Sequence, residues 1–297
     1  MKLVITGGSG FVGSRLIPVL LDHGHRITVL DHRPPRWPVG FVEADLGGRE
    51  LEPSHFEAAD AVLHLAGKNL FGRWDEVSKK QIRDTRIQGT ASLVSCLAKL
   101  KRRPGALISA SAIGYYGDRG EEDLDESSAP GDDFLASVCI GWEEEARKAE
   151  GLGLRTVQIR TAPVLGHGGM LSKIEPIYRL GLGGPLGDGK QWFSWIHLDD
   201  LVAIYVRAVE SQDLSGPVNA SSPHPVRNRE FSRTLASVMR RPHLFFAPKW
   251  ALKMIFNDLA SMVLASEKVH PARLKAIGFH FAYPEVRQAL ENLYRRP

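Results

Sequence analysis

Apolar runs alternate with amphipathic stretches along the first two-thirds of the chain. The run KLVIT is short, rich in β-branched residues and followed by glycines, which predicts a buried strand. The next stretch, FVGSRLIPVLLDHG, has apolar residues at positions 12, 16, 19 and 20, the spacing of one helix face, and ends at Gly24. Further strands are predicted in HRITVLD, DAVLHLAG, GALISAS and LRTVQIR, and helices in KKQIRDTRIQGTASLVSCLAKLK and DDFLASVCIGWEEEARKAEGLG. This alternation predicts βαβ units, and therefore an α/β fold with a doubly wound parallel sheet.

From about residue 164 the pattern loosens. GHGGM, GLGGPLGDGKQ and SSPHPVR are loops rich in glycine and proline, and such loops on an α/β scaffold usually shape a substrate site. KWALKMIFNDLASMVLASEKV is apolar and helical, and the chain closes with an extended piece and a last helix. We predict a sheet domain of residues 1–163, to which parts of 190–220 return. Residues 164–297 form a smaller, mixed C-terminal substrate lobe that ends in a small helical domain from about residue 245.

Composition limits the class of protein. Of the 297 residues, 43% are hydrophobic and 24% are charged, which is typical of a globular protein with a real core. The first residues show no signal-peptide pattern, and no run approaches the roughly 18 apolar residues of a membrane span. The two cysteines, Cys96 and Cys139, are too few for a disulfide framework. We expect a cytoplasmic protein that does not bind membranes.

Charge is spread unevenly along the chain. Residues 118–150 carry 12 acidic and 3 basic side chains, whereas residues 226–297 carry 5 acidic and 13 basic ones. The basic residues are scattered and no nucleic-acid motif accompanies them, so no nucleic-acid partner is predicted. The eleven histidines form neither an H-x-x-x-H pair nor a Cys/His cluster, so no metal is predicted.

The sharpest local motif is TGGSGFVG at residues 6–13. Gly7, Gly10 and Gly13 are spaced as G-x-x-G-x-x-G between the first strand and the first helix. Glycines here allow a tight turn, close approach of a pyrophosphate and close helix packing, and the helix N-terminus offers free N–H groups to phosphates. The motif predicts a Rossmann-like dinucleotide site that includes Ser9, Phe11 and Val12.

Further candidate cofactor residues follow the next strands. Asp31 ends the second strand, where a carboxylate can bind the adenosine ribose of NAD. Arg33 and Arg36 follow it, and either guanidinium could bind the 2′-phosphate of NADP. The sequence therefore leaves NAD and NADP both open. The remaining candidates come from two short segments. EADL at 43–46 follows a short third strand, and HLAG at 64–67 ends the fourth strand, DAVLHLAG; the candidates in them are Asp45, Leu46, Leu65, Ala66 and Gly67.

The order of these motifs resembles the extended short-chain dehydrogenase/reductase superfamily over residues 1 to about 225. A strand with a serine cluster and YG follows HLAG in that superfamily, as LISASAIGYYGD does here with Ser109, Ser111, Tyr115 and Tyr116. HLAGKNL, IRDTRIQGT, GDGKQWFSWIHLDDLV and the tail LKAIGFHFAYPEVRQALENL are similar to an atypical epimerase-family branch, named for nucleoside-diphosphate-sugar epimerases, with a small C-terminal domain of unknown function. That resemblance covers nearly the whole chain and implies NADP(H) binding without implying a substrate.

The resemblance also implies roles for single residues. Arg86 stands where extended members carry an asparagine, and we count it among the cofactor-binding candidates. Arg160 and Val164 occupy the stretch that flanks the nicotinamide in related folds. Ser111 would fix the substrate oxygen. Extended members often dimerise through the two helices that flank the serine strand, here 77–100 and 133–149, and monomer and homodimer both stay open.

One expected feature is missing. Ordinary members carry Tyr-x-x-x-Lys in the helix after the serine strand, where the tyrosine moves a proton and the lysine holds the nicotinamide ribose. The aligned pair here is Val138 and Trp142, or Cys139 and Glu143. Glu143 is expected to pair with Arg147 one helical turn away.

Several readings of this absence are open. Cys139 could act as the acid, although nearby glutamates disfavour its thiolate. Tyr115, Tyr116 or Lys68 could donate the proton instead. The protein could bind the dinucleotide without turnover, as a regulatory or scaffold protein, or the helix could lie elsewhere. We predict an NAD(P)-binding oxidoreductase or epimerase-like enzyme with a non-standard active site, and the non-catalytic dinucleotide-binding protein is the alternative.

Overall fold

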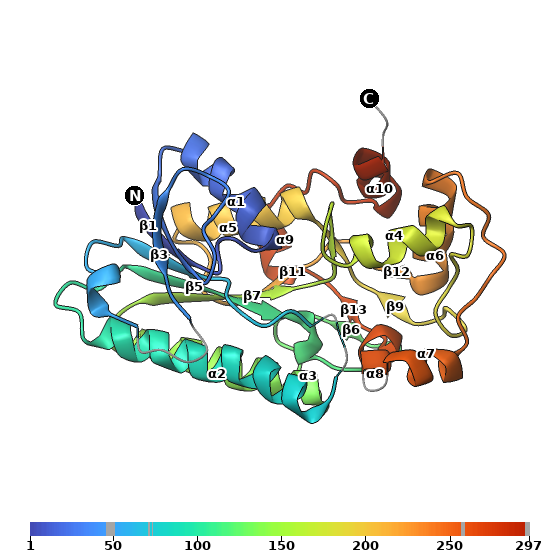
Figure 1. Ribbon diagram of the computed structural model, residues 1–297, viewed down its shortest axis with the longest axis horizontal. Coiled ribbons are helices and arrows are strands. Elements are labelled where there is room, and N and C mark those ends of the chain that lie inside the picture. Colours follow the sequence, from blue (N-terminus) through green and yellow to red (C-terminus); the bar gives the residue numbers. More distant parts are fainter. Residues whose placement is uncertain (46–50, 71, 73, 257–258, 295–297) are drawn as a thin grey trace.

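The computed structural model describes residues 1–45, 51–70, 72, 74–256 and 259–294. A seven-stranded sheet crosses one half of the molecule, and a smaller lobe lies at one end of it (Figure 1). All neighbouring strands run parallel, in the order β11-β7-β5-β4-β1-β2-β3. The strands are β1 (Lys2–Thr6), β2 (Arg26–Asp31), β3 (Gly40–Glu43), β4 (Ala61–His64), β5 (Ala106–Ala112), β7 (Arg155–Thr161) and β11 (Gly216–Ala220). The predicted doubly wound α/β fold is confirmed.

Helices cover both faces of this sheet, so both faces of its central strands are buried. α1 (Phe11–Asp22) and α5 (Leu198–Glu210) lie on one face, and α2 (Glu76–Ala98) and α3 (Phe134–Arg147) lie on the other (Figure 1). Neighbouring residues of one strand therefore enter different cores. Ile5 packs with Leu16 and Leu20 of α1, whereas Val4 packs with Leu93 of α2. Short 3-10 turns lie at η1 (Pro53–His55), η2 (Ile113–Tyr115) and η3 (Lys148–Leu152).

The lobe is built from helices and two-stranded pairs. Its helices are α4 (Leu171–Arg179), α6 (Asn228–Val238), α7 (Lys249–Phe256), α8 (Leu259–Leu264), α9 (Ala272–Ala276) and α10 (Val286–Tyr294). The short strands pair as β8 (Val164–Leu165) with β10 (Ile196–His197), β9 (Trp192–Phe193) with β12 (Val226–Arg227), and β6 (Asp123–Leu124) with β13 (Lys268–Val269). The lobe's own core centres on Trp195, which is fully buried with Leu235 and Leu290.

The chain passes between the two parts several times. α5 and β11 return to the sheet, within the 190–220 stretch expected to do so. The tail returns too, because β13 pairs with β6 and Val269 and Leu274 enter the same core as Ile5. The predicted division at residue 163 stays a prediction, and these contacts join its two parts. No helix in the described ranges is both long and apolar enough to cross a membrane.

The strand order also locates the site. β2 and β3 follow β1 on one side of it, whereas β4 and the later strands lie on its other side. The order in which strands are added to the sheet therefore reverses at β1. In open parallel sheets, ligands bind outside the carboxyl ends of the strands at such a reversal. The glycine motif at residues 6–13 lies at that end of β1.

Candidate functional site

The glycine loop has a geometry that only glycine permits. Gly7 has a φ of +71°, and a Cβ added to it would lie 2.7 Å from the backbone of Ala66. A Cβ on Gly13 would lie 2.4 Å from the carbonyl oxygen of Gly8. The loop is held to the sheet because the Gly7 N–H donates to the Leu30 carbonyl at 3.0 Å. It therefore brings α1 close to the ends of β1, β2 and β4.

The first turn of α1 offers donors that the protein does not use. Gly10 is the N-cap residue and has no side chain to accept from the first helical N–H groups. The N–H groups at the start of a helix have no intrahelical partner, so those of Phe11 and Val12 remain available. Gly10 is exposed and Phe11 and Val12 are partly exposed, so a phosphate can reach these groups. The loop fits the pyrophosphate of a dinucleotide.

Asp31 is engaged by its own neighbours. Its Oδ2 accepts from the N–H of Ser9 at 3.0 Å and from the Ser9 hydroxyl at 2.6 Å. Its Oδ1 accepts from the His32 N–H at 2.8 Å and lies 2.7 Å from His32 Nδ1. The residue is 5% exposed, and each of its two oxygens already accepts at least one hydrogen bond from the protein. Arg33 and Arg36 are exposed beside it, and neither has a hydrogen-bond or ion-pair partner in the described part of the chain.

A loop of the lobe covers the glycine loop. Gly168 and Gly169 have positive φ angles, and an added Cβ on either would lie 2.9 Å from the Phe11 ring. Val164 begins this stretch and packs, partly buried, against the same core as Val12 and Leu65. Ala66 is partly buried and Gly67 exposed after β4, and Asp45 is exposed after β3. The candidate Leu46 lies outside the described residues.

A buried network of polar side chains lies at the carboxyl ends of β5, β7 and β11, the three strands at one side of the sheet. Ser111 of β5, Arg160 of β7 and Asn219 of β11 are register neighbours, which places them side by side at the carboxyl edge. Glu143 of α3 accepts from the Ser111 hydroxyl at 2.7 Å and receives two hydrogen bonds from Arg160, each 2.8 Å long. Arg160 also donates to the Tyr116 hydroxyl at 3.0 Å, and Tyr116 donates to Asn219 at 2.7 Å.

Charge and burial fix the state of this network. Burial opposes the charge of Arg160, but the hydrogen bonds and charge of Glu143 outweigh it and raise the pKa of the guanidinium. Burial also raises the pKa of Tyr116 to about 12, and its side chain is 0% exposed. Ser111 is 4% exposed and Ser109, bonded to a backbone carbonyl, is 1% exposed. The expected pairing of Glu143 with Arg147 is wrong, because the Glu143 carboxylate forms its ion pair with the buried Arg160 of β7 instead.

Tyr115 differs from Tyr116 although it precedes it directly. Its ring stacks on the Arg160 guanidinium, whose carbon lies 3.5 Å from the ring centroid, and meets the Tyr116 ring edge-on at 5.3 Å. Tyr115 is partly exposed and packs against the core that Val12, Leu65 and Val164 also touch. No hydrogen bond to its hydroxyl is found within the described residues. Of the two tyrosines, Tyr115 has the free hydroxyl.

Cys139 and the residues around it lie between α3 and α2. α3 forms where the sequence predicts it and contains neither tyrosine nor lysine, and Val138, Cys139, Trp142 and Glu143 are all buried. Burial and the charge of Glu143 raise the pKa of the Cys139 thiol to about 12, so the thiol stays protonated. Arg86 of α2 stacks over Trp142, with 5.1 Å from the guanidinium carbon to the ring centroid.

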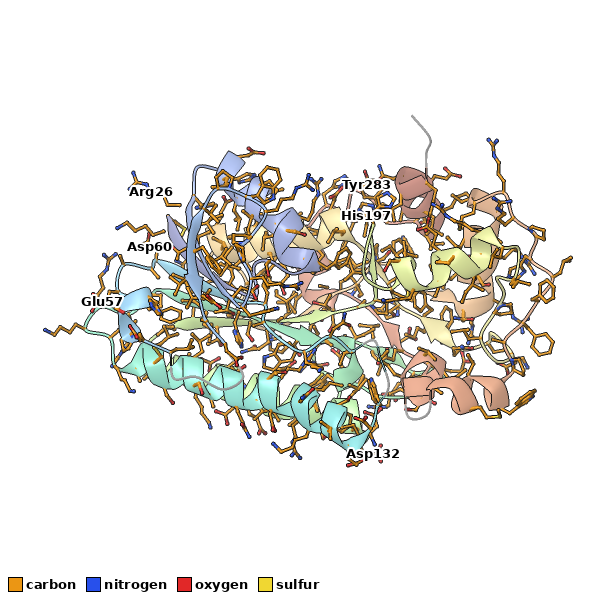
Figure 2. All side chains as sticks on the ribbon, viewed as in Figure 1. Arg26, Glu57, Asp60, Asp132, His197 and Tyr283 are labelled. Carbon is orange, nitrogen blue, oxygen red and sulfur yellow. The ribbon has the colours of Figure 1, made fainter. Side chains whose placement is uncertain are left out.

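The candidate Lys68 and the buried His197 both have partners close to them in the chain. Lys68 is exposed and donates to the side-chain oxygen of Gln81 at 2.5 Å. His197 caps α5, because its Nδ1 accepts from the Asp199 N–H at 3.1 Å, and the same nitrogen lies 3.9 Å from Oδ2 of the Asp199 carboxylate. Its ring lies 4.0 Å from that of Tyr283, where the tail meets α5 (Figure 2).

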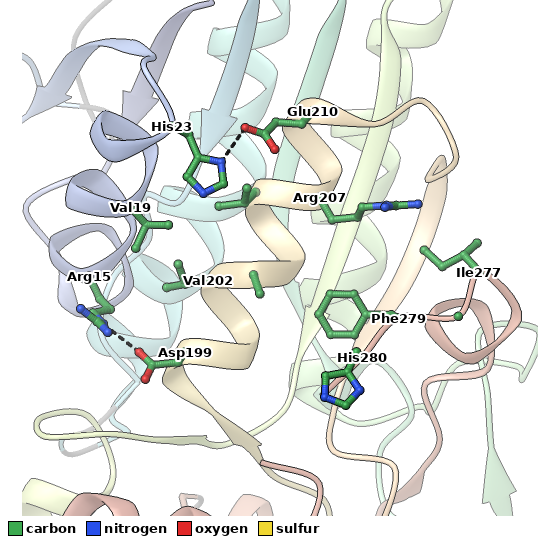
Figure 3. Close-up of a pocket in the computed structure, with 13 residues that line it drawn as sticks. Arg15, Val19, His23, Asp199, Val202, Arg207, Glu210, Ile277, Phe279 and His280 are labelled. Carbon is green, nitrogen blue, oxygen red and sulfur yellow. Dashed lines mark hydrogen bonds and ion pairs between the residues drawn. The ribbon is translucent and has the colours of Figure 1, made fainter. Parts of the chain in front are cut away.

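A cavity elsewhere on the molecule does not belong to this site. About 540 Å3 of space lies between α1, α5 and residues 277–280 (Figure 3). Its charged groups bind one another, Arg15 to Asp199 at 2.7 Å and His23 to Glu210 at 2.9 Å. None of its lining residues is a sequence candidate. Within the described ranges, no three His, Cys, Asp or Glu side chains gather as metal ligands would.

The sequence missed the partners that decide the state of the candidates. Ser9 and His32 for Asp31, Glu143 for Ser111, and Asn219 for Tyr116 are all contacts that depend on strand register or loop shape. A weak signal existed for Asn219, which lies one residue before the end of its strand, as Arg160 does in β7.

Comparisons with known proteins agree with this arrangement. The model of the NAD dependent epimerase/dehydratase family matches residues 3–220, and that of a domain of unknown function, DUF1731, matches residues 247–293. The epimerase family protein SDR39U1 homolog, chloroplastic, of Arabidopsis thaliana is 39% identical over 301 residues, which cover 99% of this chain and 86% of that protein. The epimerase family protein YfhF of Bacillus subtilis is 34% identical over 299 residues, with 99% and 98% covered.

Solved structures show the same relationship. The crystal structure of human epimerase family protein SDR39U1 (isoform 2) with NADPH has a TM-score of 0.91 and 32% identity, and covers 100% of both chains. UDP-glucuronic acid 4-epimerase from Bacillus cereus, in complex with NAD, shares the fold, with a TM-score of 0.78 at 16% identity and 99% and 96% of the two chains covered. The predicted resemblance, C-terminal domain included, is confirmed: the chain belongs to the NAD dependent epimerase/dehydratase family.

Proposed function

We propose that the protein binds NADP(H) and acts as an oxidoreductase or epimerase-like enzyme. The observation that carries this is the first turn of α1, whose N–H groups have no side-chain cap. Gly7 and Gly13 pack this turn tightly against the loop and β4, and it lies where the order of strands in the sheet reverses. Its free N–H groups and the partial positive charge of the helix end suit a pyrophosphate. A human relative of the same length and fold was crystallised with NADPH, which supports the assignment. We keep Gly7, Gly10, Gly13, Val164 and the end of β4 as cofactor residues.

The contacts of Asp31 favour NADP over NAD. A carboxylate that selects NAD must accept hydrogen bonds from the ribose hydroxyls. Asp31 already accepts from Ser9 and His32 with both oxygens, so it would have to give up those bonds. The exposed Arg33 and Arg36 have no acidic partner in the described part of the chain and suit a 2′-phosphate.

We assign proton transfer to Tyr115. The bound nicotinamide would give or take a hydride at its C4. The Tyr115 hydroxyl is free, and Arg160 holds the ring by stacking on it at 3.5 Å. Glu143 in turn holds Arg160, and Ser111 donates to Glu143. Ser111 would have to release that carboxylate before it could hold a substrate oxygen, so we give it a positioning role.

The binding claim is tested by titrating the protein with NADPH and NADH and following nicotinamide fluorescence. We expect NADPH to bind at least tenfold more tightly, and Arg33→Ala with Arg36→Ala to remove most of that preference. Gly13→Ala should abolish binding, because its Cβ would meet the Gly8 carbonyl. Gly151→Ala is the control, since nothing lies within 4 Å of its added Cβ. Failure of both cofactors to bind would overturn the proposal.

The catalytic claim is tested with Tyr115→Phe. In a screen of carbonyl substrates, this variant should lose at least 100-fold in kcat and keep its affinity for NADPH. Tyr116→Phe should retain turnover and unfold at lower urea, because it removes a buried hydrogen bond to Asn219.

One observation favours the non-catalytic alternative. Ser111, Tyr116 and Cys139 are all buried. The Ser111 and Tyr116 hydroxyls already donate hydrogen bonds to Glu143 and Asn219. If NADPH binds tightly but no substrate is turned over, and Tyr115→Phe changes nothing measurable, the dinucleotide-binding regulatory or scaffold protein replaces the enzyme.

A further inference from the structure

Arg86 is a cation that has no acidic partner among the described residues. Its one hydrogen bond to the described residues runs from Nη1 to the carbonyl of Ile82 at 3.2 Å, and no carboxylate in that part of the chain forms an ion pair with it. Burial lowers the pKa of the guanidinium to about 10, so it is still charged at neutral pH. The neighbouring Cys139 is protonated and cannot neutralise it. Arg86 is only partly exposed, so an anion would stabilise its charge better than the little water that reaches it.

Trp142, whose ring lies against the Arg86 guanidinium, has a second donor without a partner among the described residues. Its indole Nε1 is buried and has no hydrogen-bond partner, although the residue is only 4% exposed. The Arg86 guanidinium stacks against this ring. A buried donor without a partner loses about 1–3 kcal/mol of solvation, so such groups are usually satisfied by a ligand or water. Arg86 and Trp142 together have N–H groups that no described residue accepts from.

The Arg86 guanidinium lies close to the glycine loop of the dinucleotide site. The guanidinium carbon is 3.2 Å from the point where a Cβ of Gly67 would stand, so the missing side chain at 67 makes room for it. Gly67 is exposed, and it follows Ala66, whose backbone touches Gly7 of the glycine loop. Cys139 and Trp142 belong to the helix positions that align with the proton-transfer pair of ordinary relatives. Arg86 therefore lies beside the glycine loop, next to a helix position that holds the proton-transfer machinery in ordinary relatives.

We propose that Arg86 and Trp142 form a binding site for a carboxylate, so that the substrate is a carboxylic acid bound through its negative group. The planar guanidinium can hold both carboxylate oxygens in parallel, and the indole N–H can donate to one of them. This rests on the proposed function and adds the substrate class to it. The other source of anionic oxygen is the cofactor itself, to which the sequence assigned Arg86, but its pyrophosphate already has the N-terminus of α1.

The test uses oxalate as the probe and oxamide, its uncharged analogue, as the control ligand. Each is titrated into the protein with saturating NADPH, and tryptophan fluorescence is followed. We expect oxalate to bind saturably and oxamide not to bind. Arg86→Gln should weaken oxalate at least tenfold and leave NADPH affinity within twofold. Trp142→Phe keeps the packing, removes the N–H and should weaken oxalate two- to tenfold, as followed by calorimetry. Arg83→Gln, an exposed arginine of the same helix, should change neither affinity.

The outcomes separate this proposal from the proposed function. If Arg86→Gln weakens NADPH tenfold and leaves oxalate unchanged, Arg86 serves the cofactor and the carboxylate site is overturned. If neither affinity changes, or oxamide binds as well as oxalate, it is overturned as well. If NADPH fails to bind the wild-type protein, the proposed function fails, and oxalate titration without cofactor still tests the site. Should Arg86→Gln not fold, Arg86→Lys and Trp142→Phe carry the comparison.

Discussion

The ion pair of Glu143 and Arg160 joins a helix to the sheet through two parallel hydrogen bonds. Both side chains are nearly fully buried, at 6% and 3% exposure. Removing one member of such a pair leaves an uncompensated charge in the interior, which lowers stability by about 3–5 kcal/mol. We therefore expect Glu143→Gln to lower the free energy of unfolding by that amount in urea titrations. The double variant Glu143→Met, Arg160→Met should lose clearly less than the sum of the two single changes, and additive losses would contradict the pairing.

His64 makes stability depend on pH. It is fully buried between Thr6, whose hydroxyl lies 2.7 Å from Nδ1, and Thr90, whose hydroxyl lies 3.0 Å from Nε2. Burial lowers the pKa of His64 to about 4 from an ordinary value of 6.5. Between these values the unfolded chain takes up a proton that the folded chain refuses, so stability falls as the pH falls through this window.

We expect this single histidine to remove roughly 3 kcal/mol between pH 7 and pH 4. The measurement is the free energy of unfolding against pH for the wild type and for His64→Gln, which cannot titrate. The wild type should lose more on acidification, and parallel curves would show that His64 does not carry the effect.

At this scale the sequence predicts identities better than states. It singled out Asp31, Ser111 and Tyr116 as candidates, and each lies at the carboxyl edge of the sheet. It could not show that their polar atoms are occupied, because the partners Ser9, Glu143 and Asn219 lie 22, 32 and 103 residues away. Those contacts depend on register and on helix rotation, which a local pattern does not contain.

At the scale of elements, the loop around Gly169 packs against the ring of Phe11, the first residue of α1. Gly169 has a φ of +50°, and an added Cβ would lie 2.9 Å from the ring of Phe11, the first residue of α1. We expect Gly169→Ala to push this ring and weaken NADPH binding about tenfold, since 1.4 kcal/mol corresponds to that factor. Gly120→Ala is a matched control, because Gly120 also has a positive φ of +59° but open space around it. Equal losses from both variants would point to backbone strain alone.

The main elements follow from periodicity, and the small ones do not. The predicted helices and strands of the sheet are present because each has a long apolar face with the correct period. β6, β9 and β13 have two residues each and exist through pairing with distant segments, so no local pattern marks them. The single apolar helix expected near residues 249–269 is found as α7 and α8, followed by β13.

For the whole molecule, the surface of α2 and α3 bears on self-association. The family resemblance leaves open a dimer through these helices, but within these two fully described helices Val77 is the one exposed large apolar side chain, at 66%. A stable dimer needs an apolar centre to its interface. We expect Val77→Asp to leave the mass measured by light scattering unchanged. A dimeric wild type that becomes monomeric in this variant would contradict the expectation.

The tail packs into the core of the sheet, so we expect the two parts of the molecule to unfold together. Leu274 of α9 is fully buried in the core that also contains Ile5 and Ile108 of the central strands, although it is more than 160 residues from either. Truncating a buried leucine lowers stability by about 2–5 kcal/mol, through lost contacts and the cavity that remains. Leu274→Ala should therefore move the unfolding of the whole chain to lower urea, and not that of the lobe alone. Tryptophan fluorescence and far-ultraviolet circular dichroism should shift together in one transition. A separate early transition in the variant would show instead that the sheet domain stands without its tail.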